Sequence, residues 1–408
     1  MSPWSLYRKY DIAWKALYEQ SKIMKTEYSL EVFAITLAMV MAFIVSSTLL
    51  KSKIESAEVP HAYKFINGMR GLAAIFVFIN HAPFVLSNLG VQNTVFSSWG
   101  QLYPNLGSFG VQIFFCITGF LFFDKVIRNE KIDWIDFFSA RIKRVAPLYY
   151  VSSLLVFVIA ASFAGFKILD KESLITISGL LSFNFIDNPM RIGGVSLVPL
   201  SSVTWTLIHE WRFYAVLPLV AIFYRSRYKI IIMAVVMMLA AVDLGYSAVV
   251  CWVYFLTGIV AASVHKIAVT NRLLRGTAVL VAILAFVLTC GLVEVPGYGA
   301  LRFVLTSLFF ICVTIANSSF LHFQFLNRMS DISFSIYLLH LPILFVSFKV
   351  VSGFVELSSI DKFTFWAINF STIPVIVAIS TYTFVNIEKR FMRKSKAERP
   401  EGGLAQSV

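Results

Sequence analysis

Two ionisable side chains share one long apolar stretch in the first quarter of the chain, and their spacing points to chemistry within a helix. Arg70 and His81 begin and end the segment Arg-Gly-Leu-Ala-Ala-Ile-Phe-Val-Phe-Ile-Asn-His. Eleven residues at about 100° each return to nearly the same helix face, roughly 16 Å further along the axis. Ionisable groups inside a membrane are costly and usually functional, and histidine can act as a general base near neutral pH. We expect catalysis by His81 near mid-membrane, with Arg70 at the cytoplasmic mouth; the alternative is a packing histidine below a snorkelling arginine.

A cationic pair follows in the segment Arg-Ile-Lys-Arg, in which Arg141 and Arg144 are neighbours on one helix face. Guanidinium groups bind phosphate oxygens through paired hydrogen bonds. Arg141 and Arg144, at a membrane mouth just before the fourth apolar span, would suit phosphate groups. The plainer interpretation is an ordinary basic loop.

One carboxyl group stands within an otherwise apolar segment that runs from Thr204 to Tyr214. A lone glutamate in hydrocarbon is either protonated or paired, so Glu210 needs a partner. Arg212 is only two positions away and faces elsewhere, which places the expected partner on another helix. Glu210 is either a catalytic group or part of a polar clasp between helices.

Further polar candidates lie near the C-terminal end. Tyr337 and His340 are three residues apart and therefore share a helix face. Both have polar tips that require hydrogen-bond partners when buried. Together with Thr206, which lies in the same segment as Glu210, they are candidates for substrate contact or for structural hydrogen bonding.

Membrane helices must position these residues, because the composition excludes a soluble fold. Of the 408 residues, 58% are hydrophobic and 14% charged, and the mean hydropathy is +0.77. Soluble domains are about 45–50% apolar and roughly 25% charged. The net charge of +13 fits basic cytoplasmic loops better than nucleic-acid binding. The four cysteines lie in apolar runs and form no metal-binding motif, so we expect no disulfide framework and no metal site.

Runs long enough to cross a bilayer recur along the chain, and we predict an all-α, polytopic helix bundle. The stretch 174–187 is interrupted by polar residues and is expected to be an outside loop element, with a re-entrant segment as the alternative. The predicted spans are 33–50, 70–89, 107–126, 145–166, 203–224, 230–243, 247–264, 277–294, 301–319, 332–350 and 363–385.

The distribution of basic residues orients these spans. Lysine and arginine concentrate in the loops on the side of Arg70, which predicts that this side and the C-terminus are cytoplasmic. Whether 33–50 spans the membrane or lies at its interface stays open. We divide the chain into an extension with one apolar helix (1–62), a membrane domain (63–393) and a polar tail (394–408). The basic residues counted in outside loops are Lys167, Lys171, Arg191, Arg302, Lys349 and Lys362.

Taken in order, these segments resemble the acyltransferase-3 family of integral-membrane acyltransferases. The match covers about 63–393 and depends on the whole set, since each motif alone is weak. Arg212 and His209 occupy positions at which the family is commonly uncharged or variable. The matching segments are Phe65–Ala74 leading to His81, Gly110–Phe120, Arg141–Arg144 with Pro147 and Tyr149, Trp205–Tyr214, Ser333–Pro342, and Glu388.

The resemblance implies a core of about ten helices, to which 33–50 adds one more. It implies transfer of an acyl group, usually acetyl, from cytoplasmic acyl-CoA to a hydroxyl of a cell-surface or lipid-linked carbohydrate. Arg141 and Arg144, with Arg70, would hold the phosphates of the donor. His81 would be the base, oriented by Glu210, or would carry the acyl group itself. The bacterial inner membrane is the implied location, and acyl-CoA, a carbohydrate and the lipid bilayer are the implied partners.

A transporter or flippase of a polar or lipid-linked substrate would also use buried histidine, glutamate and arginine. Such proteins often have inverted repeats and unwound half-helices, which this sequence does not display. We expect no permanently bound cofactor and no nucleic-acid partner. The acceptor sugar, the choice of acetyl over longer acyl groups, and the oligomeric state stay open.

Overall fold

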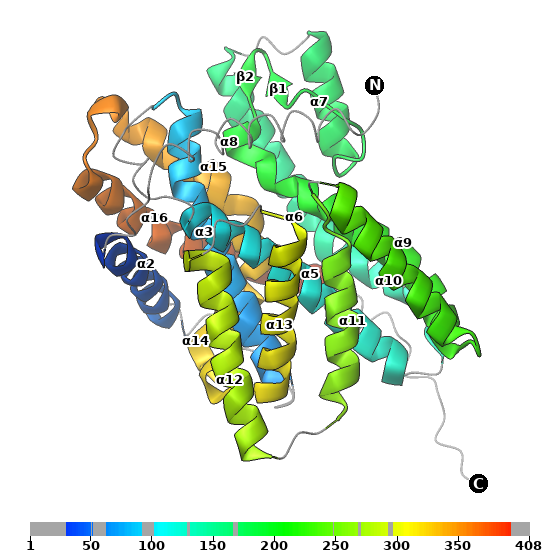
Figure 1. The fold of residues 1–408 in the computed structure, drawn as a ribbon. Coiled ribbons are helices and arrows are strands. Elements are labelled where there is room, and N and C mark those ends of the chain that lie inside the picture. Colours follow the sequence, from blue (N-terminus) through cyan, green and yellow to red (C-terminus); the bar gives the residue numbers. More distant parts are fainter. Residues whose placement is uncertain are drawn as a thin grey trace.

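A computed structural model describes residues 30–49, 51, 63–91, 102–128, 131–165, 170–247, 249–267, 271–292 and 297–392. Across these ranges the protein is a bundle of helices (Figure 1). Strands occur in the described residues only as a short hairpin, which pairs β1 (Arg191–Ile192) with β2 (Val195–Ser196). The prediction of an all-α fold is confirmed. The tail assigned to 394–408 and most of the extension assigned to 1–62 lie outside the described residues.

An apolar helix occupies the position of each predicted span. The interior of a bilayer has no water to bond backbone N–H and C=O groups, so a long apolar segment satisfies them within a helix. Among the described residues, eight helical segments are long and apolar enough to cross a membrane, and three shorter apolar helices accompany them. The eight are α3 (Lys64–Asn88), α5 (Leu102–Arg128), α6 (Trp134–Phe163), Val198–Arg225 (α8, Val198–Ser201, with α9, Trp205–Arg225), α10 (Lys229–Tyr246), Arg272–Gly291 (containing α12, Arg272–Val287), α15 (Ser333–Val351) and Phe363–Met392 (containing most of α16, Lys362–Thr383). The shorter three are Ile35–Thr48 within α2 (Leu30–Leu49), α11 (Val253–His265) and α13 (Ala300–Ala316).

One predicted boundary shifts in a way that matters for the site. The fourth span was expected from residue 145, whereas α6 begins at Trp134. Asp133 caps this helix by accepting a hydrogen bond from the Asp136 amide at 3.0 Å. Arg141 and Arg144 therefore lie inside α6, two turns from its start, where the helix backbone fixes their direction.

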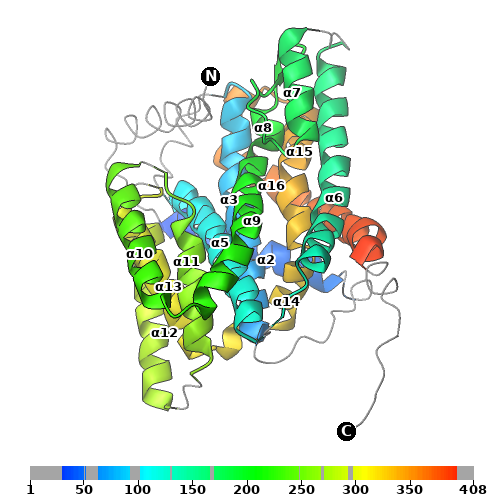
Figure 2. The same ribbon diagram turned by 90° about the vertical axis from the view of Figure 1, so that its right-hand side faces the viewer.

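The stretch expected to be an outside loop element forms a separate cap. Within it, α7 (Lys171–Leu181) is too short to span a membrane. It lies beside the β1–β2 hairpin at one end of the bundle (Figure 1). Below the cap, α3, α5 and α9 occupy the middle of the bundle, with α10 to α13 on one side and α6 and α15 on the other (Figure 2).

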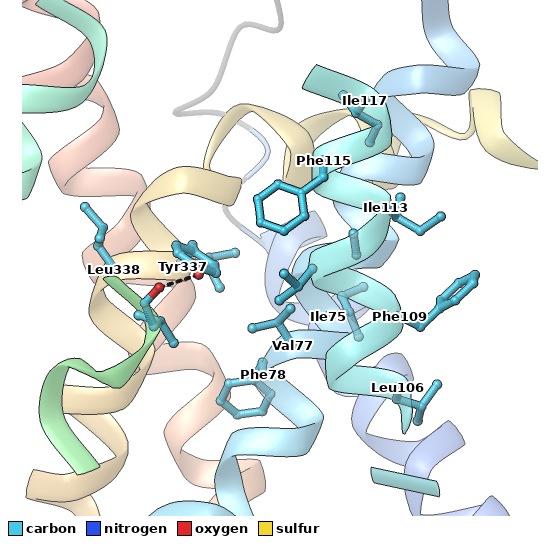
Figure 3. Close-up of a cluster of buried hydrophobic side chains, with 14 of the residues drawn as sticks. Ile75, Val77, Phe78, Leu106, Phe109, Ile113, Phe115, Ile117, Tyr337 and Leu338 are labelled. Carbon is cyan, nitrogen blue, oxygen red and sulfur yellow. Dashed lines mark hydrogen bonds between the residues drawn. The ribbon is translucent and has the colours of Figure 1, made fainter. Parts of the chain in front are cut away.

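Close backbone contact fixes the centre of the bundle. A Cβ atom on Gly119 would lie 2.3 Å from the carbonyl oxygen of Phe255, and one on Gly258 would lie 2.1 Å from that of Cys116. Small residues at such crossings let helices approach closely. Beside this crossing, side chains of α3 and α5 such as Val77, Phe109 and Phe115 form an apolar cluster (Figure 3).

The sequence analysis was wrong to count Arg302 among the basic residues of the outside loops. It lies in the first turn of α13 and its side chain is fully buried. The guanidinium donates to the Asn105 carbonyl at 2.5 Å, to Asn105 Oδ1 at 2.8 Å and to Gln112 Oε1 at 3.4 Å. Its position at the edge of an apolar run made it look like a loop residue. The structure shows that it ties α13 to α5.

Candidate functional site

A cavity of about 130 Å³ lies between α3, α5, α6, α9 and α15. Polar and charged side chains from all five helices reach its wall, although they are far apart in the sequence. Six of the eight predicted site residues line it: Arg70, Arg141, Arg144, Thr206, Glu210 and Tyr337. The other two, His81 and His340, do not line it.

Glu210 finds its partners on its own helix and on α5. Its Oε1 accepts a hydrogen bond from Thr118 Oγ1 at 3.2 Å, and its Oε2 accepts one from the Tyr214 hydroxyl at 3.3 Å. Arg212 is exposed and points away, as expected. The positive charges of Arg70 and Arg141 act on the Glu210 carboxyl group from across the cavity. The Glu210 carboxyl group is therefore fixed on the cavity wall by hydrogen bonds from α5 and α9.

Two of the three arginines on this wall face the cavity without a carboxylate bound to them. Among the described residues, no carboxylate lies within ion-pair distance of Arg70 or Arg141. The Arg141 guanidinium lies over the ring of Phe122, 5.0 Å from its centroid, and its Nε is buried without an acceptor. Buried guanidinium donors without partners are a costly arrangement unless an anion binds there.

Arg144 differs from the other two arginines because it is already paired. Its Nη1 lies 3.1 Å from Oε2 of Glu388, which is fully buried. Glu388 ends a π-helical turn (η7, Phe384–Glu388), and its Oε1 accepts a hydrogen bond from Ser335. Such turns are common at functional sites. From the sequence, only the family resemblance drew attention to Glu388, because nothing in its spacing relates it to Arg144.

A second cavity of about 200 Å³ adjoins the first. The two share Phe122 and Arg141 in their walls, so Arg141 stands at the junction between them. The second cavity is lined mainly by side chains around the start of α6, including Lys125, Lys131, Asp133 and Asp136. A ligand that filled both cavities would pass Arg141 at its middle.

The two histidines that lie outside the cavity contact each other. His340 Nε2 lies 3.1 Å from His81 Nδ1. His81 Nδ1 also lies 2.7 Å from the Val77 carbonyl oxygen, and His340 Nδ1 lies 2.8 Å from that of Ile336. The structure thus pairs His81 with His340, whereas the sequence analysis had placed Glu210 beside it. Both histidines are followed two residues later by a proline, and this is the one sequence signal they share.

Tyr337 and Thr206 bond to each other on the wall of the cavity. The Tyr337 hydroxyl donates to the Val203 carbonyl at 2.6 Å and lies 2.6 Å from Thr206 Oγ1. Its ring centroid lies 6.4 Å from that of His340, and Figure 3 shows the ring beside the apolar side chains of α3 and α5. Tyr337 thus contacts Thr206 on the cavity wall and His340 of the histidine pair.

Within the described part of the chain, no group of three or more His, Cys, Asp or Glu side chains is arranged to hold a metal ion. The four cysteines are free and buried. The chemistry of the site therefore has to be sought in the arginines, the carboxyl groups and the histidine pair.

Comparison with known proteins places this site in a family. Residues 63–385 match the acyltransferase domain family. The O-acetyltransferase OatA of Staphylococcus aureus, from strains NCTC 8325, COL and MRSA252, is 26% identical over 214 residues. That match covers 50% of this chain and 32% of each relative, so the chain is similar to about a third of their length. No solved structure matches the chain.

Proposed function

The chain belongs to this family of membrane acyltransferases, and from this premise we propose that it transfers an acetyl group from acyl-CoA to a carbohydrate hydroxyl. The similarity to proteins named O-acetyltransferase supports an oxygen acceptor. The proposal includes acyl-CoA that arrives from the cytoplasm and an acceptor that approaches from the opposite side of a bacterial inner membrane.

The observation that carries the proposal is a pair of cavities that share Arg141 and Phe122 in their walls. Coenzyme A has a phosphorylated nucleotide at one end and a thin pantetheine arm at the other. The cavity at the start of α6 offers Lys125, Lys131 and Arg141 to the charged end, beside the carboxyl groups of Asp133 and Asp136. The cavity between the helices would take the arm. Arg141 and Arg70, which no described carboxylate neutralises, would bind phosphate oxygens at the junction.

The pairing of Arg144 with Glu388 changes what was expected of the arginine pair. A carboxylate already occupies one side of the Arg144 guanidinium. We therefore assign the main phosphate contact to Arg141 and give Arg144 the supporting role of holding the cavity wall. In this arrangement Glu388 balances the charge of Arg144 when the donor is absent.

In the proposed reaction, His81 acts on the acceptor hydroxyl. Its ring is half-buried, and among the described residues no group bonds to its Nε2. Nε2 takes the hydroxyl proton as the oxygen attacks the thioester carbonyl carbon. The carbon–sulfur bond then breaks, and the CoA thiolate takes the proton back from His81. A positioned base of this kind contributes about 10²–10⁴-fold to a rate.

The Tyr337–Thr206 contact would have to open for this reaction, because both side chains line the cavity and His340, which lies beside Tyr337, does not. A closed contact keeps the thioester away from His81 until donor and acceptor are both in place. Excluding water in this way would protect the thioester from hydrolysis.

Release of CoA thiol by the purified protein tests the proposal. Acetyl-CoA and a carbohydrate acceptor are supplied, and free thiol is followed with time for the wild type and for His81→Ala. We expect thiol release that depends on the acceptor and is lost in the variant. Wild-type protein that consumes neither acetyl-CoA nor longer acyl donors would contradict the proposal and favour a transporter.

A further inference from the structure

The contact between the two histidines bears on which ring nitrogen of His81 carries a hydrogen. On the basis of the proposed function, in which His81 is the base, we propose that His340 is a positioning residue that keeps Nε2 of His81 free of its proton. His340 would do this through its own Nε2, without touching either substrate.

The positions of the hydrogen atoms follow from the carbonyl groups beside the rings. A carbonyl oxygen only accepts hydrogen bonds, so a ring nitrogen bonded to it must carry a hydrogen. His340 Nδ1 lies 2.8 Å from the Ile336 carbonyl oxygen, and therefore carries the hydrogen of that ring. In a neutral imidazole the other nitrogen is then an acceptor, which leaves a lone pair on His340 Nε2.

The same reasoning applies to His81. Its Nδ1 lies 2.7 Å from the Val77 carbonyl oxygen and 3.1 Å from His340 Nε2. Both neighbours are acceptors, so Nδ1 carries the hydrogen and shares it between them. The lone pair of the neutral His81 ring is then on Nε2. The opposite tautomer would place a lone pair on Nδ1 against two other lone pairs.

The surroundings of the pair keep this arrangement in place. His340 is fully buried, and its ring has Phe78 at a centroid distance of 6.4 Å. The His81 ring packs edge-to-face against Phe84 at 5.5 Å. Among the described residues no carboxylate bonds to either ring, so the orienting acceptor for His81 is a neutral histidine and a backbone carbonyl.

His340 also has a role after the proton has moved. When Nε2 of His81 accepts the hydroxyl proton, the ring becomes a cation that donates from both nitrogens. The lone pair on His340 Nε2 then receives a charge-assisted hydrogen bond from Nδ1, which is stronger than a neutral one. His340 would therefore favour the transition state more than the bound substrates, and its loss should lower kcat and leave KM in place.

Two amide substitutions separate this role from simple packing. In His340→Gln, the side-chain amide can donate to the Ile336 carbonyl and present its oxygen where Nε2 was. In His340→Asn, the shorter side chain keeps an amide near the position of Nδ1 and cannot reach His81. His322, which bonds to Asn317 away from the site, provides a matched control as His322→Gln.

The experiment measures kcat and the KM for acetyl-CoA, with thermal stability recorded for each protein. We expect His340→Gln to stay within about tenfold of the wild-type kcat and His340→Asn to lose roughly 10²-fold or more. Both should keep the wild-type KM within about threefold, and His322→Gln should match the wild type. If His340→Asn does not fold, the kcat of His340→Gln alone tests the positioning role. A loss of kcat in His340→Gln as large as the loss in His81→Ala would contradict that role.

Other outcomes separate this proposal from the function on which it rests. Equal kcat values for His340→Asn and His340→Gln, or a loss that appears in KM alone, would overturn the role of His340 while acyl transfer stands. A wild-type protein that transfers no acetyl group, or a fully active His81→Ala, would remove the premise and the proposal together.

Discussion

Replacing Arg141 by glutamine tests whether the junction of the two cavities binds phosphate. Arg141 lines both cavities, and none of the described carboxylates pairs with it. Glutamine removes the charge and retains much of the length of the side chain. Lys143→Gln is the matched control, because Lys143 lies on the same helix and lines neither cavity.

The size of the effect follows from the contacts that would be lost. Hydrogen bonds to charged groups contribute about 1.5–3 kcal/mol. Since each 1.4 kcal/mol is about tenfold in affinity, Arg141→Gln should raise the KM for acetyl-CoA roughly 10- to 150-fold. The kcat should change little, because Arg141 contacts the donor far from the thioester. Lys143→Gln should keep the wild-type KM.

A donor without phosphate distinguishes binding from structural damage. S-acetylpantetheine carries the thioester and the arm of acetyl-CoA and has no phosphate group. Initial rates with this donor should give the same KM for the wild type and for Arg141→Gln. The cation–π contact of Arg141 with Phe122 is lost with either donor. An equal rise in KM for both donors would therefore refute phosphate binding and assign Arg141 a structural role.

Three further substitutions probe the bundle and the cavity wall. Gly119→Ala places a Cβ 2.3 Å from the Phe255 carbonyl oxygen and should lower the free energy of unfolding by about 1–3 kcal/mol, so an unchanged melting temperature would contradict the close packing of α5 and α11. Glu210→Gln replaces the carboxyl group that accepts from Thr118 and Tyr214 and should reduce turnover roughly tenfold at an unchanged melting temperature; full activity would exclude Glu210 from the mechanism. Arg302→Met leaves both Asn105 acceptors without their donor, at about 1–3 kcal/mol each, and should lower the melting temperature while the KM for acetyl-CoA stays constant.

Hydropathy was sufficient to predict most of the fold. Bilayer-length apolar runs have few alternatives to a helix, so the positions of the apolar helices could be read from the sequence. Charge asymmetry and interruption by polar residues also marked 174–187 as unable to span, and α7 agrees with this. The start of α6 was misplaced because its first turns carry charged residues, which hydropathy does not separate from a loop.

Contacts between helices were the part that the sequence could not provide. Helical spacing indicates which residues share a face, but it does not say which helix packs against that face. His81 and His340 are 259 positions apart, and Arg144 and Glu388 are 244 apart (388 − 144), so neither pair follows from spacing. Arg302 was misassigned for the same reason, since its acceptors lie on α5. Because of these pairings, the main phosphate contact is assigned to Arg141 alone, and the partner of His81 is His340 in place of Glu210.

Transfer of a labelled acetyl group tests the central claim most directly. Membranes that contain the protein are supplied with acetyl-CoA labelled in the acetyl group, and label is measured in alkali-labile carbohydrate. We expect label in carbohydrate with the wild type and none with His81→Ala. Equal labelling by the two proteins would contradict the role of His81. Absence of label with the wild type, in the presence of acceptor glycans, would contradict acyl transfer itself.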